Sequence, residues 1–318
     1  LDRLRGAWQA RKPDAAQRRD DLQRLRDALK ARLEDMAAAI SADFGQRAKA
    51  ESLVADGMTV LNEIDHLRKH VRGWMKPKRV GVGWRFLPAR AEIRAEPIGV
   101  VGVIAPWNYP VNLALAPLAT AIAAGNHVYL KPSEHTPRSA AFLRELLAEV
   151  FPADRVAVAT GGAEVGAAFA ALPFDHLVFT GSTAVGRKVM AAAAQNLVPV
   201  TLELGGKSPA IVCDDYPVEQ AAARLANGKW FNGGQTCIAP DYVLVPEHKR
   251  DALVAALRKE VQARYGEAFD NTGDYTRIVN DGQYARLQSY LDDARHRGVE
   301  IVTLACEAEA AQLLLPPT

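Results

Sequence analysis

Cysteine is scarce in this chain of 318 residues, which contains three of them, Cys213, Cys237 and Cys306. The set is odd in number and scattered, with no CxxC spacing and no Cys/His cluster. It therefore argues against a disulfide framework and against a structural zinc site. We expect a reducing compartment, in practice the cytoplasm. In such a compartment we expect a special cysteine to be catalytic rather than structural.

Long apolar runs and an excess of charge are also missing. No run reaches the ~18 apolar residues that a membrane span needs, and no signal peptide is visible. The 39 basic and 37 acidic side chains give a formal net charge of +2, too balanced to indicate a nucleic-acid or anionic-membrane partner. Hydrophobic residues make up 49% of the chain, which is ordinary for a globular protein. Its length suggests two domains.

The two ends of the sequence look interior to a longer protein. The chain starts with Leu1 rather than Met and stops at Thr318, in what reads as the middle of a domain. We therefore expect residues to be missing at both ends.

The first 96 residues are predicted to be mainly helical. Apolar residues recur at spacings of three and four between positions 22 and 40, the pattern of one buried helix face. They are Leu22, Leu25, Leu29, Leu33, Met36 and Ile40. A second helix is expected over residues 51–75. The Gly- and Pro-containing stretch 76–96 has short β-prone pieces and suggests a hairpin or a bridging arm.

From residue 97 onward, short apolar runs alternate with helical patterns. Strands are expected at 100–105, 127–131, 156–159 and 176–180. The intervening helices are expected at 112–124, at 136–151 with Thr136 as N-cap, and in stretches that end at 171 and 196. This alternation predicts a parallel, doubly wound sheet, with ligands beyond the carboxyl ends of its strands.

A second α/β region is expected after residue 199. Its predicted strands are 200–204, 210–213 and 242–245, with a helix at 218–230 and two further helices near the end of the chain. No internal repeat stands out.

Two strand ends carry residues suited to a nucleotide. Gly181 and Ser182 end one strand and open a helix that includes Gly186, and backbone N–H groups at a helix N-terminus bind anions such as a pyrophosphate. A tight turn without ligand is the alternative, because the spacing differs from GxGxxG. The segment with Lys131, Ser133 and Glu134 has groups that reach ribose hydroxyls or phosphates, or it is a solvated charged loop.

Asn108 and Glu203 are candidates for polar catalytic roles. Asn108 lies in a loop between Pro106 and Pro110 and suits an oxyanion hole, with an ordinary Asx-turn before a helix as the alternative. Glu203 sits between two leucines at the end of an apolar strand. Partial burial there would raise its pKa toward that of a general base, whereas an ion-paired structural role is the alternative.

Cys237 is the candidate nucleophile, because it follows Gly233 and Gly234 in a loop where a substrate can approach closely. Cys213 lies in an apolar strand and is interpreted as an inert core thiol. Cys306, which follows another apolar run, is interpreted in the same way.

Five blocks in this order closely resemble the aldehyde dehydrogenase superfamily. They are residues 105–110, 131–134, 179–186, 202–209 and 231–240. The resemblance implies a Rossmann-like cofactor domain and a second α/β catalytic domain, here incomplete at its C-terminus. It divides the chain into N-terminal helices packing on the cofactor domain (1–75), a bridging arm (76–96), the NAD(P)-binding domain (97–203) and the cysteine domain (204–318).

The resemblance also assigns roles to single residues. Cys237 is expected to attack the aldehyde carbonyl, Asn108 and the Cys237 N–H to hold the oxyanion, and Glu203 to activate water that hydrolyses the thioester. The expected cofactor-binding residues are Pro106, Trp107, Lys131, Ser133, Glu134, Gly181, Ser182, Gly186 and Leu204. No metal is expected. Glu134 would repel a 2′-phosphate and so favours NAD, with NADP tolerated if this side chain swings aside.

Residues 274–280 and the spelling Gly-Gly-Gln-Thr-Cys-Ile-Ala-Pro around Cys237 resemble a shorter, dimeric branch. That branch includes coniferyl-aldehyde and fatty-aldehyde dehydrogenases. It implies a homodimer that oxidises an aromatic aldehyde or a medium- or long-chain aliphatic aldehyde.

The family places a second glutamate, in a Glu-x-Phe motif, downstream of this chain's last residue.

Three alternative functions remain open. A coenzyme-A-acylating enzyme is one alternative, but such enzymes generally lack the glutamate at the position of Glu203. A non-enzymatic structural homologue is another, against which Cys237, Glu203 and Asn108 argue together. A cysteine hydrolase lacks a recognisable histidine partner motif.

Overall fold

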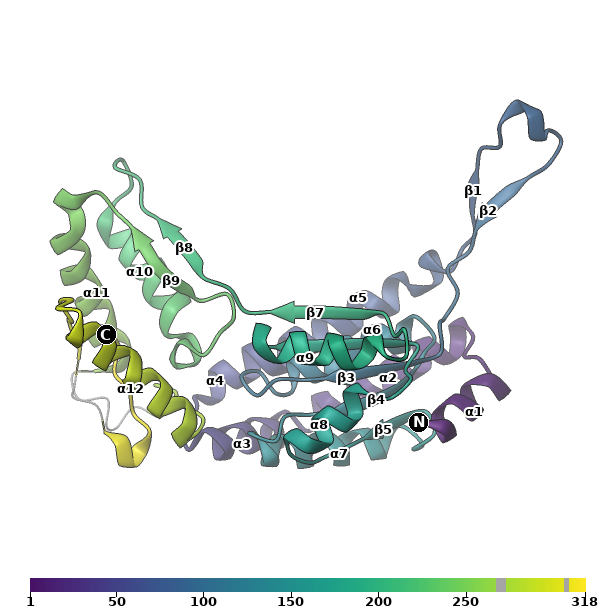
Figure 1. The fold of residues 1–318 in the computed structure, drawn as a ribbon, viewed down its shortest axis with the longest axis horizontal. Helices are drawn as coiled ribbons and strands as arrows, with labels where there is room; N and C mark the ends of the chain where they lie inside the picture. Colours follow the sequence, from purple (N-terminus) through teal and green to yellow (C-terminus); the bar gives the residue numbers. More distant parts are fainter. Residues whose placement is uncertain (267–272, 306–308) are drawn as a thin grey trace. The chain divides into compact units, whose positions relative to one another are not determined.

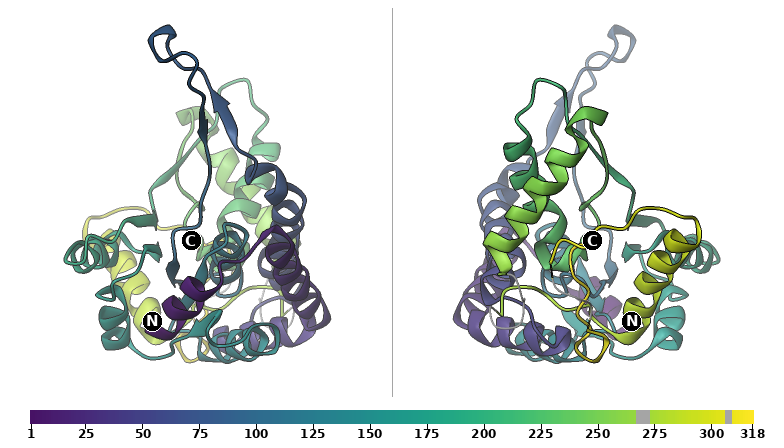
Figure 2. Two further views of the ribbon diagram at one scale, coloured as in Figure 1. Left: turned by 90° about the vertical axis from the view of Figure 1, so that its right-hand side faces the viewer. Right: turned by 90° about the vertical axis from the view of Figure 1, so that its left-hand side faces the viewer.

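The computed structural model describes residues 1–266, 273–305 and 309–318. The chain forms two compact units (Figures 1 and 2). Unit 1 consists of Leu1–Met36, Val54–Glu134 and Ser139–Glu203, and unit 2 of Ala37–Leu53, His135–Arg138 and Leu204–Thr318. Residues 37–53, which the sequence places with the first domain, therefore group with the cysteine-bearing unit. Each unit is described by itself.

Unit 1 is built on a five-stranded parallel sheet in the order β5-β4-β3-β6-β7. The strands are β3 (Val100–Ile104), β4 (His127–Lys131), β5 (Val156–Val158), β6 (His176–Gly181) and β7 (Val200–Leu204). This confirms the predicted doubly wound α/β fold. The chain builds outward from β3 through β4 to β5, then returns to place β6 on the other side of β3. The strand order therefore reverses between β3 and β6, which in open sheets of this kind is where ligands bind.

Helices cover the sheet of unit 1 in two shells. Helix α6 (Asn112–Ala123) contacts β3 and β4, α9 (Thr183–Ala194) contacts β6, and α2 (Ala15–Ala31) and α5 (Thr59–Trp74) pack on α6. The further helices are α1 (Asp2–Ala10), α7 (Pro137–Val150) and α8 (Ala163–Ala170). This cover explains why Val100, Val128 and Leu177 are fully buried and why their strands are apolar on both faces.

The single helix expected over residues 22–40 is in fact two helices, α2 and α3 (Leu33–Phe44). The apolar stripe is buried as predicted, with Leu22, Leu29 and Met36 fully enclosed. The break falls at Arg32, whose side chain forms ion pairs with Glu145 and Glu149 at 3.3 and 2.8 Å. Only one residue, Arg32, lies between the two helices, so the spacing of the apolar residues continues almost unchanged across the break. The apolar stripe therefore gave no sign of it.

Residues 78–93 form an antiparallel hairpin of β1 (Lys78–Val80) and β2 (Ala91–Ile93), drawn in Figures 1 and 2 as a narrow two-stranded arm. A 3-10 turn, Trp84–Phe86, lies at its tip, and Trp84 is 78% exposed. The hairpin therefore contributes little to the core of its unit.

Unit 2 contains the parallel strands β8 (Ser208–Ile211) and β9 (Pro240–Leu244), joined through α10 (Val218–Trp230). Helix α10 packs on α11 (Arg250–Tyr265), and α12 (Asp281–His296) begins at the N-cap Asn280. The short helix α4 (Lys49–Ser52) also belongs to this unit, and a π-helical turn, Leu53–Met58, follows it. No helix in the described parts of the chain is long and apolar enough to cross a membrane.

The N-terminus of α7 is held differently from the prediction. The hydroxyl of Thr136 is buried without a hydrogen-bond partner, so it does not cap the helix. Instead, the carboxylate of Asp43 accepts a hydrogen bond from the Arg138 backbone N–H at 2.9 Å. The capping group thus comes from a helix 95 positions earlier in the chain, where a local sequence pattern does not reveal it.

Candidate active site

Three predicted loops of unit 1 lie beyond the same edge of its sheet. Ile104, at the end of β3, pairs with Lys131 in β4 and with Phe179 in β6. The strands are parallel, so the segments that follow them emerge side by side. Residues 105–108, 132–134 and 181–182 are therefore neighbours at the point where the strand order reverses.

Lys131 and Glu134 are brought together as a buried-to-surface ion pair. The Lys131 side chain is only 3% exposed, and its ammonium lies 2.5 Å from a carboxylate oxygen of Glu134, which is one-third exposed. Ser133 between them is also buried. A cation held in the core and a carboxylate facing outward together offer donors and acceptors to a pair of hydroxyl groups.

Gly181 and Ser182 form the predicted strand-to-helix turn. Ser182 is the N-cap of α9, and its hydroxyl accepts a hydrogen bond from the Val185 N–H at 3.3 Å. A Cβ atom on Gly181 would lie 2.6 Å from the Phe179 ring, so a larger residue there would require this ring to move. Gly186 is buried one turn into the helix. Because Ser182 and Thr183 are exposed, the positive end of the helix is open to an anion.

The asparagine loop, residues 105–111, starts at β3 and ends at α6. Its Ala105 N–H donates to the Lys131 carbonyl at 3.0 Å, and Pro106, Trp107 and Asn108 are half-buried. The far end is held by Asp56, a fully buried carboxylate that accepts hydrogen bonds from the backbone N–H groups of Val111 and Asn112 at 3.1 and 3.0 Å. Asp56 was not found by sequence reasoning, since nothing near it marks a helix start.

Glu203 lies near the end of β7, as predicted, but it is exposed rather than partly buried. Strand β7 is the last in the sheet order and has one neighbouring strand, so its side chains have less cover than those of β3. Leu204 is likewise 36% exposed. The expectation that Glu203 is partly buried is therefore wrong, and the case for a general base rests on its position near the end of β7.

The cysteine loop, residues 231–239, has an unusual backbone. Asn232, Gly233 and Gly234 all have left-handed conformations, with φ of 56°, 60° and 80°. Such a run is unfavourable for residues with a Cβ atom. A Cβ on Gly233 would also lie 2.7 Å from the Thr276 carbonyl oxygen. Cys237 follows in a turn closed by a 3.1 Å hydrogen bond from the Ala239 N–H to the Thr236 carbonyl, and its thiol is exposed.

Gln235 connects the cysteine loop to residues 275–280. Its side-chain amide donates to the carbonyls of Asn232 and Arg277, both at 3.0 Å, and accepts from the Val279 N–H at 3.1 Å. One side chain thus satisfies three backbone groups, two positions before Cys237. Sequence reasoning noted both segments as markers of a branch but missed that they are in contact.

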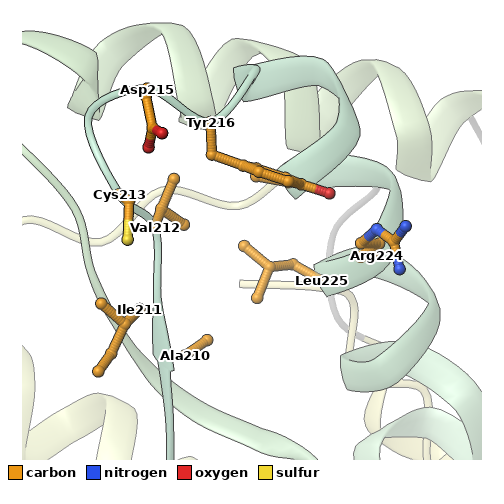
Figure 3. A pocket seen from close by; sticks show the side chains of 9 residues that line it. Ala210, Ile211, Val212, Cys213, Asp215, Tyr216, Arg224 and Leu225 are labelled. Carbon is orange, nitrogen blue, oxygen red and sulfur yellow. The ribbon is translucent and has the colours of Figure 1, made fainter.

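Cys213 is not the core thiol that the sequence suggested, because it is exposed. Side chains alternate along this stretch: Val212 packs in the core of unit 2, while Ile211 is 71% exposed. Cys213 lines a shallow, largely apolar pocket between the end of β8 and α10, together with Tyr216 and Leu225 (Figure 3). Among described residues, only one face of β8 is covered. Cys306 lies outside the described residues.

The proposed catalytic residues are distributed over both units. Asn108 and Glu203 belong to unit 1, whereas Cys237 belongs to unit 2. Each of the three residues lies at the end of a strand or in a loop next to one. Within its own unit, each can therefore be reached by a small molecule.

Comparison with known proteins identifies the family to which this chain belongs. The sequence matches the aldehyde dehydrogenase family over residues 4–318. The chain belongs to the aldehyde dehydrogenase family. The family prediction made from the five sequence blocks is thereby confirmed.

Named relatives of this aldehyde dehydrogenase chain include a probable coniferyl aldehyde dehydrogenase of Pseudomonas aeruginosa, 51% identical over 317 residues. The alignment covers 99% of this chain and 66% of that relative, so the chain spans just under two thirds of the relative's length. The predicted nearness to the coniferyl-aldehyde branch is confirmed.

Solved structures of the family superpose well on the chain. A substrate-bound Staphylococcus aureus AldH has a TM-score of 0.94 at 38% identity, covering 99% of this chain and 68% of that one. A Mycobacterium tuberculosis aldehyde dehydrogenase complexed with NAD⁺ has a TM-score of 0.85 at 28% identity, with 98% of this chain and 65% of that one covered.

Proposed function

We propose that the protein to which this chain belongs oxidises an aldehyde to a carboxylic acid with NAD or NADP, through a thioester on Cys237. The observation that carries the proposal is the family match over residues 4–318 together with an exposed Cys237 in a glycine-rich loop. A thiol in that position is free to attack a carbonyl carbon.

The family resemblance supports roles for the other residues. The Cys237 thiolate would add to the aldehyde, and the Asn108 side chain and the Cys237 N–H would stabilise the oxygen anion that forms. Loss of hydride from the aldehyde carbon to the nicotinamide, when NAD or NADP is bound, would leave a thioester on Cys237. Glu203 would then remove a proton from the water that attacks the thioester carbonyl. The acid is released and the thiol is restored. Exposure of Glu203 on its strand leaves it accessible to water, which suits this task.

The residues at the sheet edge fit a dinucleotide. The buried Lys131 ammonium and the Glu134 carboxylate suit the hydroxyls of an adenosine ribose, and the open N-terminus of α9 at Gly181 and Ser182 suits a pyrophosphate. Pro106, Trp107, Ser133, Gly186 and Leu204 would complete the contacts. When bound, NAD or NADP supplies the hydride acceptor that the oxidation requires. Residues 97–203 would then act as the cofactor domain and residues 204–318 as the catalytic domain.

We also propose the class of aldehyde, the oligomeric state of the protein and its cellular compartment. The branch resemblance supports an aromatic aldehyde such as coniferyl aldehyde, or a medium- or long-chain aliphatic one, and a homodimer. Sparse cysteines in a chain with an exposed thiol support the cytoplasm.

Turnover measurements test the proposal. NAD or NADP is mixed with a panel of aromatic and aliphatic aldehydes, and the absorbance of reduced cofactor is followed for wild type, Cys237→Ala and Cys213→Ala. Cys213→Ala is the matched control, because it removes another exposed thiol of unit 2. We expect Cys237→Ala to lose roughly 10³-fold or more in kcat, and Cys213→Ala to behave as wild type.

Two results would overturn it. Absence of turnover by the full-length wild type with every aldehyde would favour a structural homologue. Turnover that needs coenzyme A in place of water would favour the acylating alternative, and Glu203→Gln would then have no effect.

A further inference from the structure

Glu51 lies far from Cys237 in sequence but contacts the base of the cysteine loop. It belongs to α4, a four-residue helix in unit 2. One carboxylate oxygen accepts a hydrogen bond from the Asn232 backbone N–H at 3.2 Å and another from the Thr276 hydroxyl at 2.9 Å. The same oxygen thus joins the first left-handed residue of the loop to the segment against which Gly233 packs.

The segment on the other side of the loop is itself held in place. Gln46 binds the backbone of this segment at two points. Its side-chain amide donates to the Tyr275 carbonyl, and its backbone carbonyl accepts from the Arg277 N–H, both at 3.1 Å. The Ile278 N–H donates to the Leu313 carbonyl at 3.0 Å. Residues 275–279 therefore form a fixed surface, and Glu51 and Gln235 attach the cysteine loop to it.

The loop's own backbone hydrogen bonds involve carbonyls of its left-handed residues: those of Asn232 and Gly234 accept from the Gln235 and Thr236 N–H groups at 3.1 and 2.9 Å. The Asn232 N–H is bound from outside the loop, and a buried backbone N–H without a partner is costly. Asn232 is fully buried. Its N–H points at Glu51, so the carboxylate both satisfies this donor and fixes where the loop turns.

We propose that Glu51 is a positioning residue for Cys237: it sets the conformation of residues 231–237 without touching the substrate. This inference rests on the proposed function only for what the cysteine does. The hydrogen-bond arrangement itself stands whether or not Cys237 is the nucleophile.

The test compares hydrogen exchange and thiol reactivity in the intact protein. Deuterated samples are digested for wild type and for the variants Glu51→Ala, Glu51→Gln and Thr276→Val. The control is Glu219→Ala, because Glu219 is an exposed glutamate at the start of α10. We expect peptides covering 231–237 to exchange about tenfold faster or more in Glu51→Ala. Glu51→Gln keeps an acceptor oxygen and should stay within about threefold of wild type, with Thr276→Val between them.

A second readout separates positioning from general weakening. A purely structural loss would accelerate exchange in α10 and α11 as much as in the loop, whereas positioning predicts a change confined to residues 231–237. Alkylation of Cys237 by iodoacetamide, read peptide by peptide by mass spectrometry, should change in Glu51→Ala, while that of Cys213 should not. In turnover, kcat should fall with the KM for cofactor unchanged, and Glu51→Gln should restore most of it.

The outcomes are distinct from those of the proposed function. Loop exchange in Glu51→Ala within about twofold of wild type, or acceleration spread evenly over unit 2, would overturn the positioning role. If Glu51→Ala does not fold, unchanged loop exchange in Thr276→Val would do so. Retained turnover in Cys237→Ala would instead refute the nucleophile assignment, while the exchange result still reports on Glu51.

Discussion

The asparagine loop and the cysteine loop are each held by a carboxylate, and both carboxylates come from residues 51–56. The two loops differ in how much their conformation depends on that carboxylate. Asp56, in the π-helical turn, accepts two N–H groups at the start of α6. Glu51, in α4, accepts one loop N–H and one hydroxyl. The first loop also starts from a central strand and contains two prolines, whereas the second has a left-handed backbone and attaches to residues 275–279.

The difference shows two ways to fix a polar side chain in space. A loop between a buried strand and a helix inherits its position from the sheet, and a carboxylate mainly caps the helix. A loop of left-handed residues takes its position from long-range contacts, so its conformation is more readily changed by a distant substitution. Substitutions in the two loops should therefore differ in their effects on stability and turnover.

Replacing Asp56 should have the largest effect on stability. Asp56→Ala leaves the Val111 and Asn112 N–H groups buried and unpaired, and we expect the free energy of unfolding to fall by about 3 kcal/mol. Asp56→Asn keeps an acceptor and should lose less. Urea unfolding followed by circular dichroism measures both, and a loss in Asp56→Ala no larger than in Asp56→Asn would contradict the capping role.

Adding a methyl group to Gly233 should act on the cysteine loop alone. Gly233→Ala must keep φ near 60° with its Cβ 2.7 Å from the Thr276 carbonyl, and we expect a cost of about 2 kcal/mol. Turnover should fall with it, because the loop must shift. Gly206→Ala is the control, since nothing lies within 4 Å of a Cβ there. Equal melting temperatures for the two variants would refute the close approach.

Glu51 should make stability depend on pH in a defined direction. Burial raises its pKa from the ordinary 4.5, the Thr276 and Asn232 hydrogen bonds and Arg47 oppose the rise, and Asp274 adds to it. A raised carboxyl pKa stabilises the fold fully below the unfolded value, and this contribution is lost as the pH rises through the folded value.

The melting temperature of wild type should therefore fall relative to that of Glu51→Gln between about pH 4.5 and neutrality. Tyr265, which also faces Glu51, has its pKa raised to about 12 by burial and stays neutral throughout. Scanning calorimetry of the two proteins across this range gives the answer. A difference in melting temperature that is constant with pH would show that the Glu51 pKa is not raised.

Removing a proline from the asparagine loop should have the smallest effect. Pro106→Ala increases the freedom of the unfolded chain, and we expect a loss of about 0.5 kcal/mol. The loop should keep its position, because β3 and Asp56 still hold both ends. If thermal unfolding and the KM for aldehyde both changed strongly, the loop would depend on its own rigidity more than on the sheet.

Much of the scaffold was predictable because its signals are local. The strands with Val100, Val128 and Leu177 are continuous apolar runs, and Ser182 opens a helix directly after Gly181. The sequence blocks placed Lys131, Asn108 and Gly181 at or just after strand ends, and the register of the parallel strands brings these ends side by side. In each case, neighbouring residues carried the information.

What was missed depends on contacts between distant residues. Asp43 takes the capping role expected of Thr136 and lies in another helix. Asp56 and Glu51 give no local sign that they bind loop backbones. The exposure of Cys213 and Glu203 depends on how many neighbours cover a strand, and an apolar pattern alone does not specify that number.

The thioester proposed on Cys237 can be trapped in a variant that lacks the water-activating carboxylate. Glu203→Gln is mixed with NAD and a reactive aromatic aldehyde, quenched in acid and digested, and the Cys237 peptide is weighed. We expect an adduct of the aldehyde's mass less two hydrogen atoms on Cys237, because hydride and a proton have left, and no such adduct on the Cys213 peptide. An unmodified Cys237 peptide during continued turnover would contradict it.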